Sequence, residues 1–184
     1  MPEKPILQHG VRILRPAEYE ALRSATNPQQ QKQLDALLLL GARYIEAQRI
    51  QENKEWVSGK FIHLPPGASL KVKMRYPERI IRLSNIGEVL IPQLFETKKL
   101  PSRVAWGQNL KRWAKKTNLD TIGLCAKATR KTYESWLVYY FPAYITHITL
   151  SQGHTAVTSV AHYLNMPFTT EDKGVMEKWV AGWI

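Results

Sequence analysis

Residues 29 to 47 restrict the possible folds of this chain more than any other stretch. Strong helix formers fill the segment, and five apolar side chains recur at the spacing of one helix face: Leu34, Leu37, Leu38, Ala42 and Ile45. We therefore expect a core helix here. Gly41 interrupts the pattern just before Arg43, and a glycine inside a helix costs about 1 kcal/mol relative to alanine. This cost indicates a break or a close backbone approach at Gly41.

A small sheet is expected in the next part of the chain, and no other segment indicates strands. Three segments are rich in β-branched, aromatic and alternating residues, at 56–64, 69–74 and 78–83. Turns that contain proline separate them, at 65–67 and 76–77. Because such turns favour chain reversal, the pattern predicts three short antiparallel strands.

Most of the remaining chain has helical patterns. Pro16 begins a short helix with acidic residues near its start, where the helix dipole favours negative charge. Further helices are expected at 85–95, 101–116, 120 onward, 127–141, 144–150 and 170–183. The predicted fold is mainly α with a small three-stranded antiparallel sheet. Residues 1–15 carry two prolines and little periodicity, so we interpret them as an entry arm or linker remnant before one domain at 16–184.

The charge of the chain indicates a polyanionic partner. The net charge is +11 and the pI is about 9.8. Eight cations lie between residues 101 and 135: Arg103, Lys111, Arg112, Lys115, Lys116, Lys127, Arg130 and Lys131. Only Asp120 and Glu134 oppose them there. Because basic proteins also bind membranes and ribosomes, charge alone does not identify the partner.

Cysteine content and hydropathy exclude several classes of protein. Cys125 is the single cysteine, so the chain has neither an internal disulfide nor a site with several thiolate ligands. No apolar run approaches the roughly 20 residues of a membrane span, and the first residues lack the apolar core of a signal peptide. We expect a soluble cytoplasmic protein without a membrane partner.

The segment from Gly153 to Tyr163 places a histidine and a tyrosine nine residues apart, between two apolar stretches. In one continuous helix, His154 and Tyr163 would point to different sides. Gly153 favours a turn, and Thr155 or Thr158 is suited to the start of a following helix. We therefore expect His154 on a loop and Tyr163 on the helix after it, so that both side chains can meet.

Four stretches of the chain, in this order, resemble the tyrosine recombinase (phage and archaeal integrase) catalytic domain. Residues 41–46 resemble the Gly-x-Arg-x-x-Glu segment that carries the first catalytic arginine, and residues 79–83 resemble the hairpin strand after the catalytic lysine. Residues 127–132 resemble the His-x-x-Arg box. A Gly-His pair precedes the nucleophilic tyrosine by the same nine residues as Gly153-His154 precedes Tyr163.

The resemblance implies a role for each matched side chain. Arg43 and Arg130 would clamp a phosphate, since guanidinium forks match its oxygens and stay charged. Tyr163 would attack phosphorus, and His154 would hydrogen-bond a nonbridging oxygen. Lys127 stands where most of the family has a histidine that accepts the tyrosine's proton. A lysine there carries a full charge and no aromatic ring, which puts that role in question, although the same departure resembles archaeal virus integrases and Lys127 stays among the proposed catalytic residues.

The family's general acid is a mobile lysine on the turn between the second and third strands. Lys73 fits best because it lies next to that turn, and Lys71 and Arg75 remain alternatives. Other cations are expected to contact the DNA backbone: Lys71, Arg75, Lys111, Arg112, Lys115, Lys116 and Lys131. A solvated cationic surface that touches nothing explains the cations of 101–116 equally well.

The resemblance implies a site-specific DNA recombinase or integrase that acts through a 3′-phosphotyrosyl intermediate, without a cofactor or metal ion. Its partners would be double-stranded attachment sites and its own copies, as a tetramer on DNA and a monomer or dimer when free. It would act near the nucleoid. The family's N-terminal DNA-clamping domain is expected to be absent from this chain. Alternatives are a type IB topoisomerase, a noncatalytic basic DNA-binding module and an inactive relative.

Overall fold

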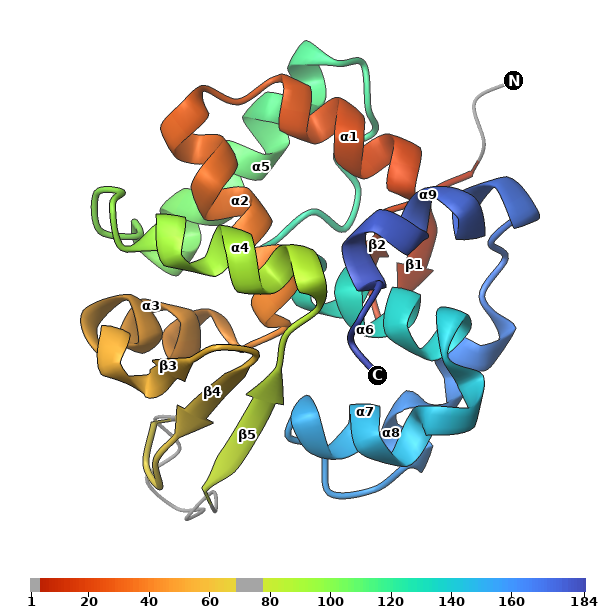
Figure 1. Cartoon of the computed structure of the whole chain (residues 1–184). Coiled ribbons are helices and arrows are strands. Elements are labelled where there is room, and N and C mark those ends of the chain that lie inside the picture. The colour runs from red at the N-terminus through yellow and green to blue at the C-terminus, as the bar shows by residue number, and fades with distance from the viewer. Residues whose placement is uncertain (1–3, 69–77) are drawn as a thin grey trace.

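Helices dominate the structure, and its strands are short. The computed structural model describes residues 4–68 and 78–184 (Figure 1). Its helices are α1 Pro16–Ser24, α2 Pro28–Leu40, α3 Tyr44–Glu52, α4 Asn85–Leu94, α5 Arg103–Lys116, α6 Ala128–Tyr140, α7 Ile145–Ser151, α8 Thr158–Ala161 and α9 Thr170–Val180, with 3-10 turns η1 Lys54–Trp56, η2 Pro142–Tyr144 and η3 His162–Asn165. Its strands are β1 Ile6–Gln8, β2 Val11–Ile13, β3 Val57–Ser58, β4 Phe61–Leu64 and β5 Arg79–Arg82. The predicted fold class is confirmed.

The break expected at Gly41 separates two helices. Gly41 ends α2 with a left-handed φ of +53°, a conformation that costs little only for glycine. The Gln152 side chain lies so close that a Cβ on Gly41 would stand 2.5 Å from its Oε1. Both reasons for a glycine, a positive φ and a close approach, therefore apply at Gly41. The chain then restarts as α3 with Arg43 at its N-terminus.

The predicted three-stranded sheet forms, but its strands are divided differently. The stretch 56–64 contains two strands, β3 and β4, because Gly59 reverses the chain with a φ of +55°. β4 pairs antiparallel with β5, so the order is β3-β4-β5. The strand expected at 69–74 lies outside the described residues.

A second sheet near the N-terminus was not predicted, so the expectation of a single sheet is wrong. β1 and β2 form a tight hairpin through His9 and Gly10, both with positive φ. Its strands have three residues each, too few to produce a recognisable alternation. Ile13 and Leu14 are nevertheless buried, and the hairpin packs against α6. Part of the segment interpreted as an entry arm therefore contributes to the core.

One helix boundary also differs from the prediction. Residues 120 to 127 form turns, and α6 begins only at Ala128. The Asp120 carboxylate accepts a hydrogen bond from the Ile122 amide, and Gly123 has a φ of +73°. The Gly123 carbonyl accepts from the Arg12 amide, so this turn extends the edge of the β1–β2 hairpin.

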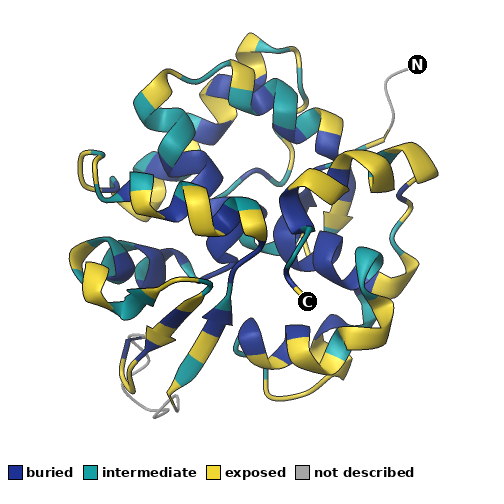
Figure 2. Cartoon of the chain, in the orientation of Figure 1, coloured by how far each residue is buried: buried dark blue, intermediate teal, exposed yellow. Residues whose placement is uncertain are grey.

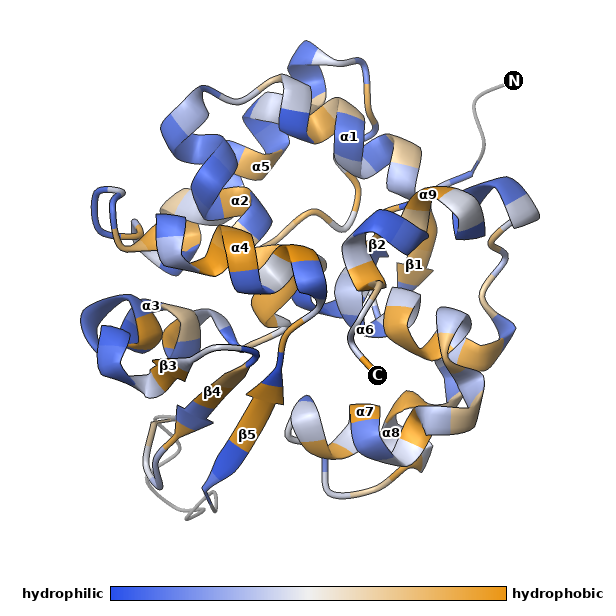
Figure 3. Cartoon of the chain, in the orientation of Figure 1, coloured by the Kyte–Doolittle hydropathy of each residue, from blue (hydrophilic) through white to orange (hydrophobic). Residues whose placement is uncertain are grey.

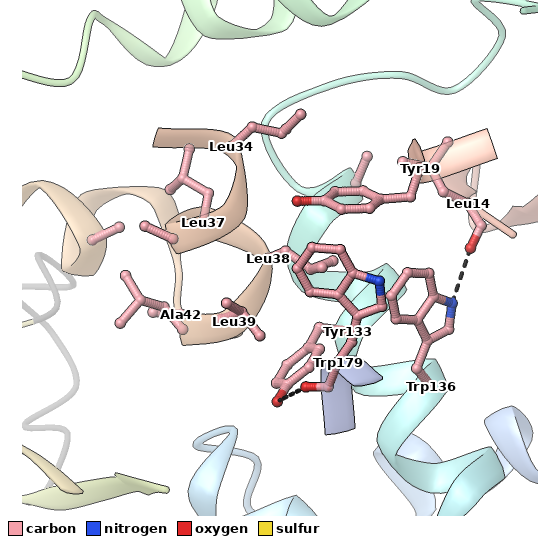
Figure 4. Packing of buried hydrophobic residues seen from close by; sticks show 14 of the residues in the cluster. Leu14, Tyr19, Leu34, Leu37, Leu38, Leu39, Ala42, Tyr133, Trp136 and Trp179 are labelled. Atoms are coloured by element: carbon pink, nitrogen blue, oxygen red, sulfur yellow. Dashed lines mark hydrogen bonds between the residues drawn. The ribbon is translucent and has the colours of Figure 1, made fainter. Parts of the chain in front are cut away.

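The core lies where α1, α2, α6 and α9 meet. Figure 2 shows the buried residues on the inner sides of these helices, and Figure 3 shows the same sides as hydrophobic. In Figure 4, Trp136 donates from its indole nitrogen to the Leu14 carbonyl at 3.0 Å. Tyr19 packs edge-on against Trp136 and Trp179, with ring centroids 5.8 and 5.2 Å apart. Trp179 and Trp183 are both buried, so the last helix packs within its own chain.

Candidate active site

One cavity of about 620 Å³ brings together residues from five distant parts of the chain. Five of the six side chains to which the resemblance assigns a catalytic role line it: Arg43, Lys127, Arg130, His154 and Tyr163. They come from the α2–α3 junction, the start of α6, the loop after α7 and η3. The sixth, Lys73, lies outside the described residues, as do Lys71 and Arg75.

Arg43 is held at the start of α3 by its own helix. Its backbone amide donates to Glu46 Oε2 at 2.8 Å, and its Nη1 donates to Glu46 Oε1 at 2.9 Å. Its Nη2 donates to the Gly153 carbonyl at 3.2 Å. Glu46 is only 1% exposed, so the pair is not the surface ion pair that spacing alone suggests. The Arg43 side chain remains 30% exposed and faces the cavity.

Arg130 lies deeper and reaches the same carboxylate. Its Nη2 donates to the Gln152 carbonyl at 2.6 Å and lies 3.4 Å from His154 Nε2. Its Nη1 lies 3.9 Å from Glu46 Oε2 and has no hydrogen-bond partner in the described part of the chain. Burial lowers the pKa of Arg130, and nearby carboxylates partly offset this effect. A buried guanidinium with an unused donor is well suited to bind an anion.

Arg79 completes this cluster, and sequence reasoning gave it no role in the site. Its Nη2 donates to Glu46 Oε2, and its Nη1 donates to the Ser151 carbonyl at 2.6 Å. Burial and the charges of Arg130 and Arg43 lower the pKa of Arg79 to about 10, while Glu46 acts in the opposite direction. One signal in the sequence pointed to this cluster. Glu46, the carboxylate that Arg79 contacts, stands three residues after Arg43 and matches the Gly-x-Arg-x-x-Glu pattern.

The backbone carbonyls at the C-terminal end of α7 accept hydrogen bonds from the three arginines of this cluster. Arg79 donates to Ser151, Arg130 to Gln152 and Arg43 to Gly153. The last carbonyls of a helix lack intrahelical partners and carry partial negative charge, so guanidinium donors are favourable there. The three contacts fix the loop that starts at Gly153, which has a φ of +70°, and so position His154.

Tyr163 is buried in the wall of the cavity. It lies on η3, which continues α8 directly, so the expected turn followed by a helical segment is present. Its hydroxyl donates to Gln8 Oε1 at 2.8 Å, and its side chain is among the largest that are fully buried. Burial raises the pKa of Tyr163 well above its usual range, and the charge and hydrogen bonding of Glu134 raise it further. Arg130 opposes this shift.

Three more residues that line the cavity had no assigned role: Gln8, Glu134 and His162. Gln8 Oε1 accepts from Lys131 Nζ at 2.9 Å as well as from Tyr163, and Gln8 Nε2 contacts His162. Glu134 contacts His154. Gln8 could not be found from sequence, because the segment before Pro16 has no recognisable pattern.

The two lysines at the start of α6 lie in different surroundings. Lys127 is exposed and stands at the N-cap of α6 with helical backbone angles, and it lines the cavity together with Arg130, three residues later. Lys131 is half-buried, and burial lowers its pKa, with Lys127 adding to the decrease and Glu134 opposing it.

The basic residues of α5 point away from the core. Trp106, Leu110 and Trp113 are buried, and the four cations are exposed: Lys111, Arg112, Lys115 and Lys116. Arg103, at the first position of α5, lines the cavity. The exposed cations therefore lie toward the C-terminal end of α5, whereas Arg103 at its start faces the cavity.

Within residues 4–68 and 78–184, no group of three or more histidine, cysteine, aspartate or glutamate side chains is placed to hold a metal ion. Nor does any helix of those ranges have the length and apolar character needed to cross a bilayer.

Solved structures of recombinases share this architecture. XerA recombinase aligns with a TM-score of 0.61 at 15% identity, over 97% of this chain and 66% of XerA. The Tn1549 transposon integrase in complex with circular intermediate DNA gives 0.61 at 15% identity, over 97% of this chain and 67% of the integrase. XerH site-specific recombinase bound to difH substrate gives 0.60 at 14% identity, over 84% of this chain and 50% of XerH.

The chain has the tyrosine recombinase catalytic-domain fold. It spans about two thirds of XerA and half of XerH. No protein-family model matches the sequence, and no curated protein matches it. At 14 to 15% identity, the likeness to these recombinases is one of fold.

Proposed function

We propose that this chain is the catalytic domain of a site-specific DNA recombinase that cuts and rejoins strands through a bond between Tyr163 and a 3′ phosphate. The observation that carries the proposal is the single cavity that Arg43, Arg130, His154 and Tyr163 line. A phosphodiester repels nucleophiles because its oxygens are anionic. Two guanidinium groups neutralise that charge and stabilise the further charge that develops in the transition state.

In the proposed step, the Tyr163 hydroxyl oxygen attacks phosphorus and the bond from phosphorus to the 5′ oxygen breaks. The 5′ oxygen leaves as a hydroxyl after it takes a proton from a general acid, for which we propose Lys73, with Lys71 and Arg75 as alternatives. The phosphotyrosyl bond retains the energy of the broken bond, so rejoining needs no ATP. His154 would donate to a nonbridging oxygen.

The proposed substrate is double-stranded DNA. The exposed cations at the C-terminal end of α5 suit a phosphate backbone. The XerH and Tn1549 integrase structures contain DNA, which supports the same class of partner here. We further propose that several copies assemble on DNA, because strand exchange needs as many nucleophiles as strands.

A covalent-trapping experiment tests the proposal. The chain is incubated with duplexes of randomised sequence that carry a nick, so that the short 5′-hydroxyl fragment is lost and rejoining is prevented. We expect an adduct that survives detergent, with Tyr163 as the modified residue by mass spectrometry. Tyr163→Phe should abolish the adduct and retain DNA affinity, and Tyr144→Phe, at an exposed tyrosine, should change neither.

The alternatives predict other outcomes. A noncatalytic DNA-binding module would bind the duplexes and give no adduct with the wild-type chain. A topoisomerase would give the adduct and relax supercoiled plasmid, but would not recombine two copies of the captured sequence.

A further inference from the structure

Glu134 is a buried carboxylate beside the proposed nucleophile. It lies one helical turn after Arg130 on α6, and its side chain is 2% exposed. Its Oε1 contacts His154 Nε2, and it lines the same cavity as Tyr163. Helical spacing of four residues puts Arg130 and Glu134 on one face, so both point into the site.

A buried carboxylate is unfavourable in a cavity that is proposed to bind phosphate. Its negative charge repels the substrate, and taking it out of water is costly unless it is paired. His154 and the nearby Arg130 offset part of this cost. Glu46 already serves as the shared partner of the three arginines. Glu134 is therefore not needed as the partner of that cluster, and its carboxylate is available for a separate function.

The reaction needs a proton acceptor. The ring nitrogens of the two nearby histidines already have partners in this structure: His162 Nε2 contacts Gln8, and His154 Nε2 contacts Glu134. Two further neighbours of Tyr163 are poor candidates. Lys127 as an ammonium has three donors and no acceptor. Gln8 Oε1 accepts the hydrogen bond of Tyr163 in this structure, but an amide does not take up a proton near neutral pH. An ionised carboxylate is a pure acceptor and takes up a proton readily.

We propose that Glu134 is a catalytic residue that accepts the phenol proton of Tyr163 as the phosphotyrosyl bond forms. This inference rests on the proposed function. In the step, the proton moves from the Tyr163 oxygen to a Glu134 carboxylate oxygen while that phenol oxygen bonds to phosphorus. The bond to the 5′ oxygen breaks, and this oxygen takes its proton from the separate general acid. On rejoining, Glu134 returns the proton to the phenol.

The effect of Glu134→Gln on the reactivity of Tyr163 tests the role of Glu134 as proton acceptor, and the test needs no DNA. Glu134→Gln removes a negative charge that raises the pKa of Tyr163, so more phenolate forms at a given pH. If Glu134 acted only through its charge, Tyr163 would react faster with an electrophile in this variant. If Glu134 takes the proton, Tyr163 reacts more slowly despite its lower pKa.

The probe is an aryl sulfonyl fluoride, and labelling of the Tyr163 peptide is followed by mass spectrometry. We expect Glu134→Gln to slow labelling at least tenfold, and Glu134→Asp, which keeps a carboxylate, to recover part of the rate. Glu177→Gln removes a charge from an exposed position on α9 and should leave the rate unchanged. Unchanged or faster labelling in Glu134→Gln, or no labelling of the wild type, would overturn the proposal. Circular dichroism confirms that each variant is folded.

The adduct assay separates this inference from the proposed function. If the wild type forms the DNA adduct and Glu134→Gln forms it as fast, the recombinase proposal stands and the role of Glu134 is wrong. If the wild type labels with the sulfonyl fluoride in a Glu134-dependent manner and forms no DNA adduct, the proton acceptor is supported and the recombinase proposal fails.

Discussion

Arg43 donates a hydrogen bond to the carbonyl of Gly153, a residue 110 positions later in the chain. Arg130 and Arg79 make the equivalent contact to the two preceding carbonyls, of Gln152 and Ser151. The same guanidinium groups share the buried Glu46 carboxylate. Three guanidinium groups thus fix the loop that carries His154, and two of them, of Arg43 and Arg130, are also proposed to bind phosphate.

The shared carboxylate should be essential for stability. Glu46→Gln leaves the cluster of three arginines without its buried counter-charge, so we expect a loss of about 3 to 5 kcal/mol in the free energy of unfolding. Urea denaturation measures it. Glu52→Gln breaks an exposed pair with Lys99 and should cost about 1 kcal/mol or less. Equal losses in the two variants would show that the cluster does not stabilise the fold.

Gly41 should not tolerate a side chain. Gly41→Ala places a Cβ in a left-handed conformation and against the Gln152 side chain, so we expect a loss of about 1 to 3 kcal/mol. Gly174, in α9, has open space around it, and Gly174→Ala should stabilise by about 0.5 to 1 kcal/mol. Thermal denaturation should move the two midpoints in opposite directions. A higher midpoint for Gly41→Ala would contradict the close contact.

Tyr163 should make stability depend on alkaline pH. Its pKa is raised in the folded chain, whereas the unfolded chain has the ordinary value of 10.0. The folded state then holds the phenol proton more tightly, so this contribution is complete below pH 10.0 and is lost as the pH rises further. Above that pH, the wild type should lose stability more steeply than Tyr163→Phe.

Denaturant titrations at several alkaline pH values measure this difference. Tyr144→Phe, at an exposed tyrosine, is the matched control. Parallel pH profiles for the wild type and Tyr163→Phe would mean that the phenol is not perturbed.

The basic face of α5 should govern the salt dependence of DNA binding. Replacing Lys111 and Lys115 with glutamine removes two exposed charges, so we expect the slope of log K against log salt to fall by about one for each lost phosphate contact. Fluorescence anisotropy with a duplex of any sequence provides the measurement. Lys173→Gln, on α9, should leave the slope unchanged. An unaltered slope in the α5 variant would support a solvated surface that touches nothing.

Local patterns in the sequence predicted the elements that have strong local signals. The helix broken at Gly41 and the final helix capped by Thr169 follow from spacing and capping, which act within a few residues. The reversal at Gly59 was missed because the residues on both sides favour strands equally. The short β1–β2 hairpin depends on packing against α6, which no local pattern records.

The residues of the candidate site likewise fall into those that the sequence predicted and those that it did not. Arg43, Arg130, His154 and Tyr163 were found through motif order and line one cavity. Arg79 and Glu134 are buried charges whose roles arise only from side chains far away in sequence. A single sequence cannot distinguish such a carboxylate from the many that face solvent on a helix. Its role becomes visible only in the folded structure, where its partners lie beside it.

The hairpin β1–β2 has a practical consequence for producing this domain. The Gln8 side chain joins the phenol of Tyr163 to the ammonium of Lys131, so the first strand forms one wall of the cavity. An expression clone that started at Pro16 would still encode every proposed catalytic side chain. It would nevertheless lack that wall and expose the face of α6 that Ile13 and Leu14 cover. Truncation for crystallisation or assay should therefore stop short of Ile6.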